Sequence, residues 1–104
     1  MGVKIMPQIG TFQKKNESKV REFNGRGGSL VEWENKYETC VYIHVDNKYD
    51  KKRKYWVGVT HEGEGGMGPD LGLVFDTKKE AYNKAYKIMK ELRNNPGNFQ
   101  AYMI

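Results

Sequence analysis

The segment that most constrains the fold is a short apolar run followed directly by a capped amphipathic helix. Residues 71–75 (Leu-Gly-Leu-Val-Phe) are typical of a short buried strand. Thr77 and Glu80 then match a capping box, in which the threonine hydroxyl accepts a hydrogen bond from a helix-start amide and the glutamate reaches back to the amide of Thr77. The next apolar side chains are spaced to fall on one helical face: Ala81, Ala85, Ile88, Met89 and Leu92. These signals predict a helix over residues 77–93 with one face available to cover a sheet.

Two segments, residues 40–46 and 54–60, carry the clearest strand pattern, because apolar and polar side chains alternate along both. Antiparallel pairing about Asp50 would set three apolar pairs on one face: Val41 with Val59, Ile43 with Val57, and Val45 with Tyr55. A slip of one residue would turn one apolar set to the wrong side, so the register is well specified. The opposite face would carry Tyr42, His44 and Trp56, with His44 across from Trp56.

Together these patterns predict an α+β fold: an antiparallel sheet of four to five strands with one C-terminal helix packed on one face. Another strand is expected over residues 30–34, and the apolar tail 99–104 is expected to dock as an edge strand. The 104 residues fit one domain, 1–104. Its basic N-terminal segment, about residues 1–28, is expected to be mobile, with a polar connector over 13–28 that holds one short strand near 20–23. Trp33 and Trp56 are expected to be at least partly buried.

Positive charge is concentrated in three blocks. The chain carries a net charge of +5; residues 1–30, 48–54 and 78–104 each contribute +4, while residues 31–47 contribute −3 and residues 55–77 contribute −4. Blocks of this kind suit a polyanion partner such as nucleic acid. A solvated surface that keeps the protein soluble is the alternative interpretation of the same pattern.

The densest of these blocks is the connection between the two alternating strands. It places four consecutive cations beside aromatic residues; cations neutralise phosphates with release of counterions, and aromatic rings stack on bases. The residues expected at a nucleic-acid interface are Lys51, Lys52, Arg53, Lys54 and Tyr49 from this hairpin tip, Tyr42, His44 and Trp56 from the sheet face, and Lys14, Lys15, Lys19, Arg21 and Arg26 from a basic N-terminal arm. The alternative is a solvated tip, with the aromatic face covered by the N-terminal segment.

No pattern in the chain predicts catalysis, a metal site or a cofactor. Residues 63–68 (Gly-Glu-Gly-Gly-Met-Gly) match a dinucleotide-binding glycine pattern, but a strand rather than a helix is expected after it, and Glu64 would repel phosphate. A flexible loop between two strands is expected there instead. Cys40 and His44 would lie roughly 13 Å apart on one strand, too far to share a zinc ion. We therefore predict that the protein is not an enzyme and that it needs no metal or cofactor.

Residues 75–86 (Phe-Asp-Thr-Lys-Lys-Glu-Ala-Tyr-Asn-Lys-Ala-Tyr), placed after a basic hairpin, resemble the plant ethylene-response and phage integrase arm-type DNA-binding domains. The likeness covers about residues 39–93. It implies three antiparallel strands packed on one helix, and reading of the DNA major groove by the sheet. Those families carry arginines and tryptophans on the DNA-facing strands, whereas this sheet offers Tyr42, His44, Trp56 and Thr60, with the cations confined to the tip.

The sequence thus predicts a small non-enzymatic nucleic-acid-binding protein that uses the basic hairpin tip and the aromatic sheet face, with DNA favoured over RNA. The alternative is a protein-interaction module, such as a phage- or plasmid-type modulator of a host protein complex, that uses the same face against a protein. Cys40 is the single cysteine, no run approaches the ~18 apolar residues of a membrane span, and no signal peptide is recognised. A cytoplasmic protein without membrane contact is expected.

Overall fold

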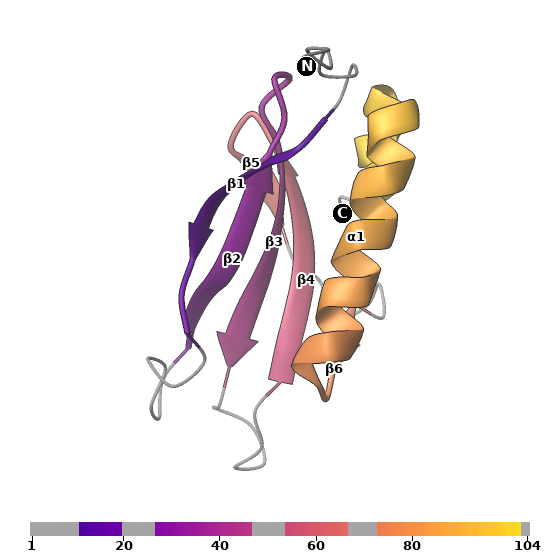
Figure 1. Cartoon of the computed structure of the whole chain (residues 1–104). Helices are drawn as coiled ribbons and strands as arrows, with labels where there is room; N and C mark the ends of the chain where they lie inside the picture. The colour runs from indigo at the N-terminus through magenta and orange to yellow at the C-terminus, as the bar shows by residue number, and fades with distance from the viewer. Residues whose placement is uncertain (1–10, 20–26, 47–53, 67–72, 103–104) are drawn as a thin grey trace, which may run out of the picture.

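The strands come first along the chain and the longest helix follows them. The structure, a computed structural model, describes residues 11–19, 27–46, 54–66 and 73–102. In these ranges the strands are β1 (Gln13–Glu17), β2 (Gly28–Glu34), β3 (Thr39–Asp46), β4 (Lys54–His61), β5 (Glu64–Gly66) and β6 (Val74–Phe75), and the helices are α1 (Lys78–Asn94) and the 3-10 helix η3 (Pro96–Tyr102). The predicted α+β class is confirmed, because an antiparallel sheet carries α1 on one face (Figure 1).

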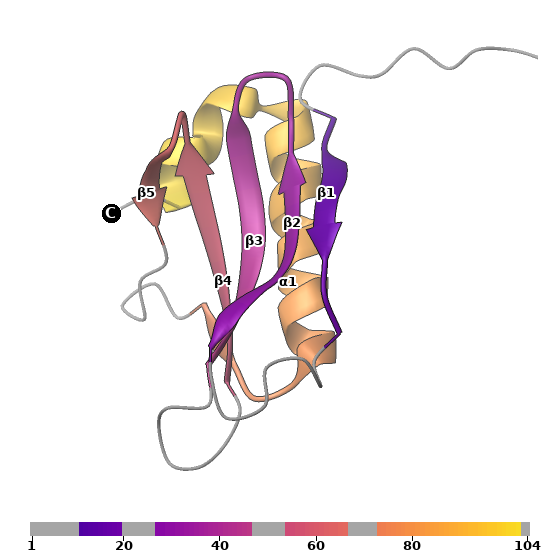
Figure 2. The ribbon, with the colours of Figure 1, turned by 90° about the vertical axis from the view of Figure 1, so that its left-hand side faces the viewer.

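The sheet is an antiparallel meander in the order β1-β2-β3-β4, with α1 behind it in the view of Figure 2. β5 pairs with residues 59–61 at the end of β4, and β6 pairs with Tyr55 and Trp56 at its beginning. The described chain therefore forms a six-stranded sheet. This is slightly larger than the predicted four to five strands, because β1 and β5 join it at segments where the sequence predicts no strand.

The register between β3 and β4 is the predicted one. The apolar pairs are Val41 with Val59, Ile43 with Val57, and Val45 with Tyr55, and His44 lies opposite Trp56. All three apolar pairs are buried in the core that α1 covers. β2 adds Val31 and Trp33 to the same face, where they lie opposite Ile43 and Val41.

α1 packs on the sheet through its predicted apolar face, whose buried residues are Ala81, Ala85, Ile88, Met89 and Leu92. The cap is also as predicted, since the Thr77 hydroxyl accepts a hydrogen bond from the amide of Glu80 at 3.1 Å. The second half of the box differs. The Glu80 carboxylate accepts the hydroxyl proton of Thr77 at 2.8 Å, where the sequence pattern predicts a bond to the Thr77 amide.

Two segments at the ends of the fold differ from the prediction. Residues 13–28, predicted to be a mobile connector, contain β1, which pairs with β2 from Gln13 to Glu17; the strand predicted near 20–23 lies outside the described residues. In the tail predicted as an edge strand, residues 99–102 lie in η3 instead, and residues 103–104 lie outside the described residues. η3 still docks, because Phe99 stacks on His61 with their ring centroids 3.8 Å apart.

The glycine-rich segment after β4 also contains regular structure. Glu62 and Gly63 both have positive φ, 53° and 80°, as a tight hairpin turn requires. β5 follows this turn and pairs back on β4, where the sequence predicts a loop. Within the strand predicted over residues 71–75, Val74 and Phe75 form β6 and Leu73 is buried. Across the described ranges, no helix is long and apolar enough to cross a membrane.

Candidate nucleic-acid interface

The sheet face opposite α1 is the first candidate interface, and no helix or strand in the described ranges covers it (Figure 1). Strand alternation places Tyr42, His44 and Trp56 together on this face, as predicted; they are called the aromatic trio below. Trp56 is partly buried, as expected. This surface is called the open sheet face below. Its described residues, all partly exposed, are Glu32, Glu34, Cys40, Tyr42, His44, Lys54, Trp56 and Thr60.

The aromatic residues of the open sheet face are positioned by the strands beneath them. The Tyr42 ring packs directly over Gly58. Any larger residue at position 58 would clash with this ring. Trp56 presents a different feature: its indole nitrogen is buried and has no hydrogen-bond partner among the described residues. An unsatisfied buried donor costs about 1–3 kcal/mol.

Two carboxylates share the open sheet face, and the predicted site does not include them. Glu32 lies opposite Tyr42, and Glu34 lies opposite Cys40. Burial, followed by the charges of these two glutamates, raises the pKa of the Cys40 thiol to about 11. Their alternation with the apolar residues of β2 was the sequence signal that could have found them. Negative charge beside the aromatic trio opposes the binding of phosphate there.

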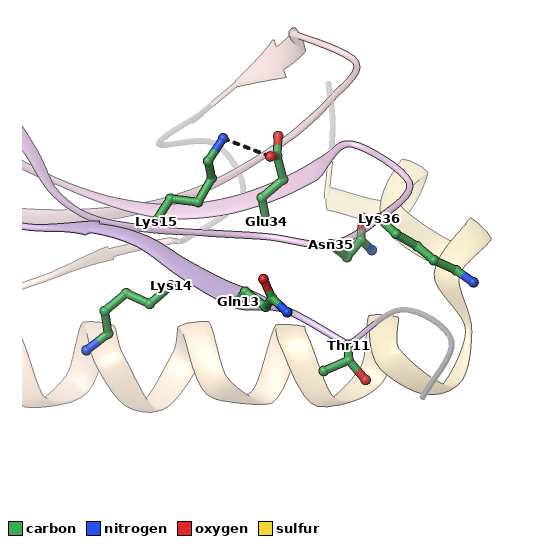
Figure 3. A pocket seen from close by; sticks show the side chains of 7 residues that line it. All are labelled: Thr11, Gln13, Lys14, Lys15, Glu34, Asn35 and Lys36. Atoms are coloured by element: carbon green, nitrogen blue, oxygen red, sulfur yellow. Dashed lines mark hydrogen bonds and ion pairs between the residues drawn. The ribbon is translucent and has the colours of Figure 1, made fainter. Parts of the chain in front are cut away.

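Three of the lysines predicted to bind phosphate lie on described strands, and each is ion-paired. The pairs are Lys14 with Glu17 at 2.9 Å, Lys15 with Glu34 at 2.9 Å, and Lys54 with Asp76. In the hollow drawn in Figure 3, Lys15 and Glu34 point to one side of the sheet edge, whereas Lys14 points toward α1. Each of these cations therefore already has a carboxylate partner.

The remaining predicted residues are mostly outside the described chain. Lys19 is exposed and makes an interaction of its own. The predicted site residues outside the described ranges are Arg21, Arg26, Tyr49, Lys51, Lys52 and Arg53. Their assignment to a nucleic-acid interface stays a prediction.

The outer face of α1 is a second cationic surface, which the predicted site does not include. Side chains at positions i, i+4, i+7, i+8, i+11 and i+14 lie side by side on a helix. This surface is called the helix stripe below; its members are Lys79, Asn83, Tyr86, Lys87, Lys90 and Arg93, all exposed. Among the described residues, none of its four cations makes an ion pair. At 1.5 Å per residue the stripe is about 21 Å long.

Glu17 joins β1 to α1 beside the helix stripe. Its carboxylate accepts hydrogen bonds from the Lys14 ammonium at 2.9 Å and from the Tyr82 hydroxyl at 2.7 Å. These two bonds hold the pKa of Glu17 below its usual value. Burial and the bond to Glu17 raise the pKa of Tyr82. The edge strand is therefore fixed against the helix, with Lys14 on the helix side.

Comparisons of the chain with protein-family profiles, with curated proteins and with solved structures find no match in any of the three. Within the described ranges, no group of three or more His, Cys, Asp or Glu side chains is arranged to hold a metal ion. The charge and shape of the two surfaces are thus the observations from which a function can be inferred.

Proposed function

We propose that the protein is a non-enzymatic nucleic-acid-binding protein that contacts phosphates through the helix stripe. The supporting observation is the difference in charge pairing. The four cations of the stripe have no ion pair among the described residues, while Lys14, Lys15 and Lys54 on the strands each have one. A cation that is not already paired gives up no protein contact when it binds phosphate, and counterion release then favours the complex.

The shape of the stripe fits this role. Its cations are carried on one rigid helix, so they approach an extended polyanion together along about 21 Å. Arg93 lies in the last turn, where the helix dipole favours positive charge. The basic hairpin tip predicted from the sequence would add to the same interaction if it reaches the same strand of nucleic acid.

A salt titration tests the proposal. The affinity of the parent protein for a random 20-nucleotide DNA, single-stranded and duplex, is measured by fluorescence anisotropy over a range of salt concentrations. The helix variant carries Lys79→Gln, Lys87→Gln, Lys90→Gln and Arg93→Gln, because glutamine keeps helix propensity. The matched control carries Lys51→Gln, Lys52→Gln, Arg53→Gln and Lys54→Gln, which removes the same charge from the hairpin tip.

Removal of one cation that binds a phosphate should flatten the plot of log affinity against log salt by roughly 0.7–0.9. We expect the slope to fall furthest in the helix variant and less in the tip variant. A parent protein that binds neither DNA at low ionic strength would refute nucleic-acid binding. A larger fall in the tip variant would return the phosphate-binding role to the tip and refute the assignment to the helix. Circular dichroism checks that both variants keep their helix.

A protein partner on the open sheet face is the second candidate. The observation in its favour is that Tyr42, His44 and Trp56 share a face that also carries Glu32 and Glu34. Aromatic residues suit a protein interface, and nearby carboxylates disfavour a polyanion. Binding of this kind would weaken little with salt and would not change in the helix variant.

A further inference from the structure

A groove lies between the two residues that lead into β1, Thr11 and Phe12, and the second half of α1, at the edge of the helix stripe. Its lining residues are Thr11, Phe12, Trp33, Tyr86, Met89, Lys90 and Arg93, and its volume is about 320 Å³. This size is at the lower end of the range for small-ligand pockets. The walls are mostly aromatic and apolar, and the two cations come from the helix stripe.

Two rings on the helix side of the sheet, those of Trp33 and Tyr82, hold Tyr86 in place. Trp33 lies 5.7 Å from Tyr82 in an edge-to-face arrangement and 5.6 Å from Tyr86, and the two tyrosine rings are 5.9 Å apart. Trp33 is only 5% exposed, but Tyr86 is 52% exposed. The buried Trp33 and the half-buried Tyr82 therefore fix Tyr86, and about half of its side chain is free to contact a ligand.

Lys90 and Arg93 follow Tyr86 by four and seven residues, which places them on the same helical face. Neither makes an ion pair among the described residues. An exposed ring flanked by unpaired cations is complementary to a ligand that has both a flat π surface and negative charge. A nucleotide has both.

We propose that this groove receives one unstacked base of a single-stranded nucleic acid. Tyr86 is the stacking ring, and Lys90 and Arg93 bind the flanking phosphates. This inference rests on the function proposed above and adds the class of nucleic acid. Proteins that bind single strands combine a positively charged groove with aromatic rings on which bases stack. In a duplex the bases already stack on each other, so only a single strand can offer a base to Tyr86 without unpairing.

The test compares single-stranded DNA with its duplex for the parent protein and three variants. Tyr86→Leu removes the ring, and we expect it to lower single-strand affinity by roughly 5- to 150-fold, the range that corresponds to one stacked base. Duplex affinity should be unchanged. Tyr86→Phe keeps the ring and should bind like the parent. The matched control is Tyr37→Leu, since Tyr37 is also exposed and has the Lys36 ammonium 5.3 Å from its ring, but lies in the turn between β2 and β3.

The outcomes separate this inference from the proposed function. If the parent protein binds DNA but Tyr86→Leu keeps its full single-strand affinity, or weakens duplex binding equally, the base site is refuted and nucleic-acid binding stands. If the parent binds no DNA, both are refuted. An acidic peptide with aromatic residues could also fit the groove. Tighter binding of a peptide that alternates glutamate and phenylalanine, abolished in Tyr86→Leu, would assign the groove to a protein segment instead.

Discussion

The open sheet face and the helix stripe both carry lysines near aromatic rings, but the two surfaces differ in whether those lysines form ion pairs. On the sheet, Lys15 is paired with Glu34 and Lys54 with Asp76, and Glu32 lies beside the aromatic trio. On α1, the carboxylates are engaged by neutral donors: Glu80 accepts a bond from the Thr77 hydroxyl and Glu91 from the Asn98 amide. The cations of the stripe are left for a partner outside the described chain.

This difference shows that aromatic residues and cations in one region do not by themselves define a nucleic-acid interface. Surface ion pairs contribute little to stability, about 0–1 kcal/mol at most sites. They nonetheless neutralise the local field that would attract a polyanion. The open sheet face has the rings, but its lysines are paired and Glu32 adds negative charge. The helix stripe has both Tyr86 and unpaired positive charge.

The comparison requires that α1 is fixed to the sheet, so the largest expected effect is on stability. Leu92 is fully buried between the helix and the sheet. Leu92→Ala should destabilise the fold by about 2–4 kcal/mol, since it removes buried methyl groups and leaves a cavity. Asn83→Ala, an exposed position on the same helix, should change stability little. Urea unfolding curves measure both, and an unchanged midpoint for Leu92→Ala would mean that the helix does not pack as described.

The second prediction tests the negative field of the open sheet face through Cys40. Its thiol pKa is raised from 9.0 to about 11, so the reactive thiolate is scarce at neutral pH. Alkylation by iodoacetamide should therefore be slow at pH 8 and should rise with pH toward a midpoint near that pKa. Glu32→Gln removes a charge that raises the pKa and should speed the reaction, whereas Lys15→Gln should slow it. If neither variant changed the rate of Cys40 alkylation, the negative field of the open sheet face would be contradicted.

The sequence predicted those elements in which one local pattern decides the structure. The β3–β4 register follows from alternation, because any slip exposes Val41, Ile43 and Val45 or their partners. α1 follows from a capping residue and a continuous apolar face. β1 could not be predicted in this way. All five of its side chains are exposed, so its pattern carries no alternation, and it exists because β2 offers an edge to pair with.

For the candidate site, the sequence predicted which residues share a face of the sheet but not which cations are ion-paired. Alternation placed Tyr42, His44 and Trp56 on one face correctly, and it could also have placed Glu32 and Glu34 there. Which cations are paired depends on contacts between segments far apart in the chain, such as Lys15 with Glu34 and Lys54 with Asp76. The groove beside Tyr86 likewise needs Thr11 and Phe12, which lead into β1, to lie beside α1, so no local pattern indicates it.

The smallest expected effect tests directly whether pairing decides where nucleic acid binds. Glu17→Gln releases Lys14 on the helix side of the sheet edge, while Glu34→Gln releases Lys15 on the opposite side (Figure 3). Both variants remove one negative charge, so the net charge of the protein rises equally. Glu17→Gln should let one more cation bind phosphate, steepening the salt dependence by roughly 0.7–0.9 and raising affinity at low salt. Glu34→Gln should leave the slope as in the parent protein, because the released lysine faces away from the stripe.

Anisotropy titrations with single-stranded DNA measure both slopes. If affinity rose equally in the two variants, net charge rather than location would govern binding, and the distinction between the two faces would fail.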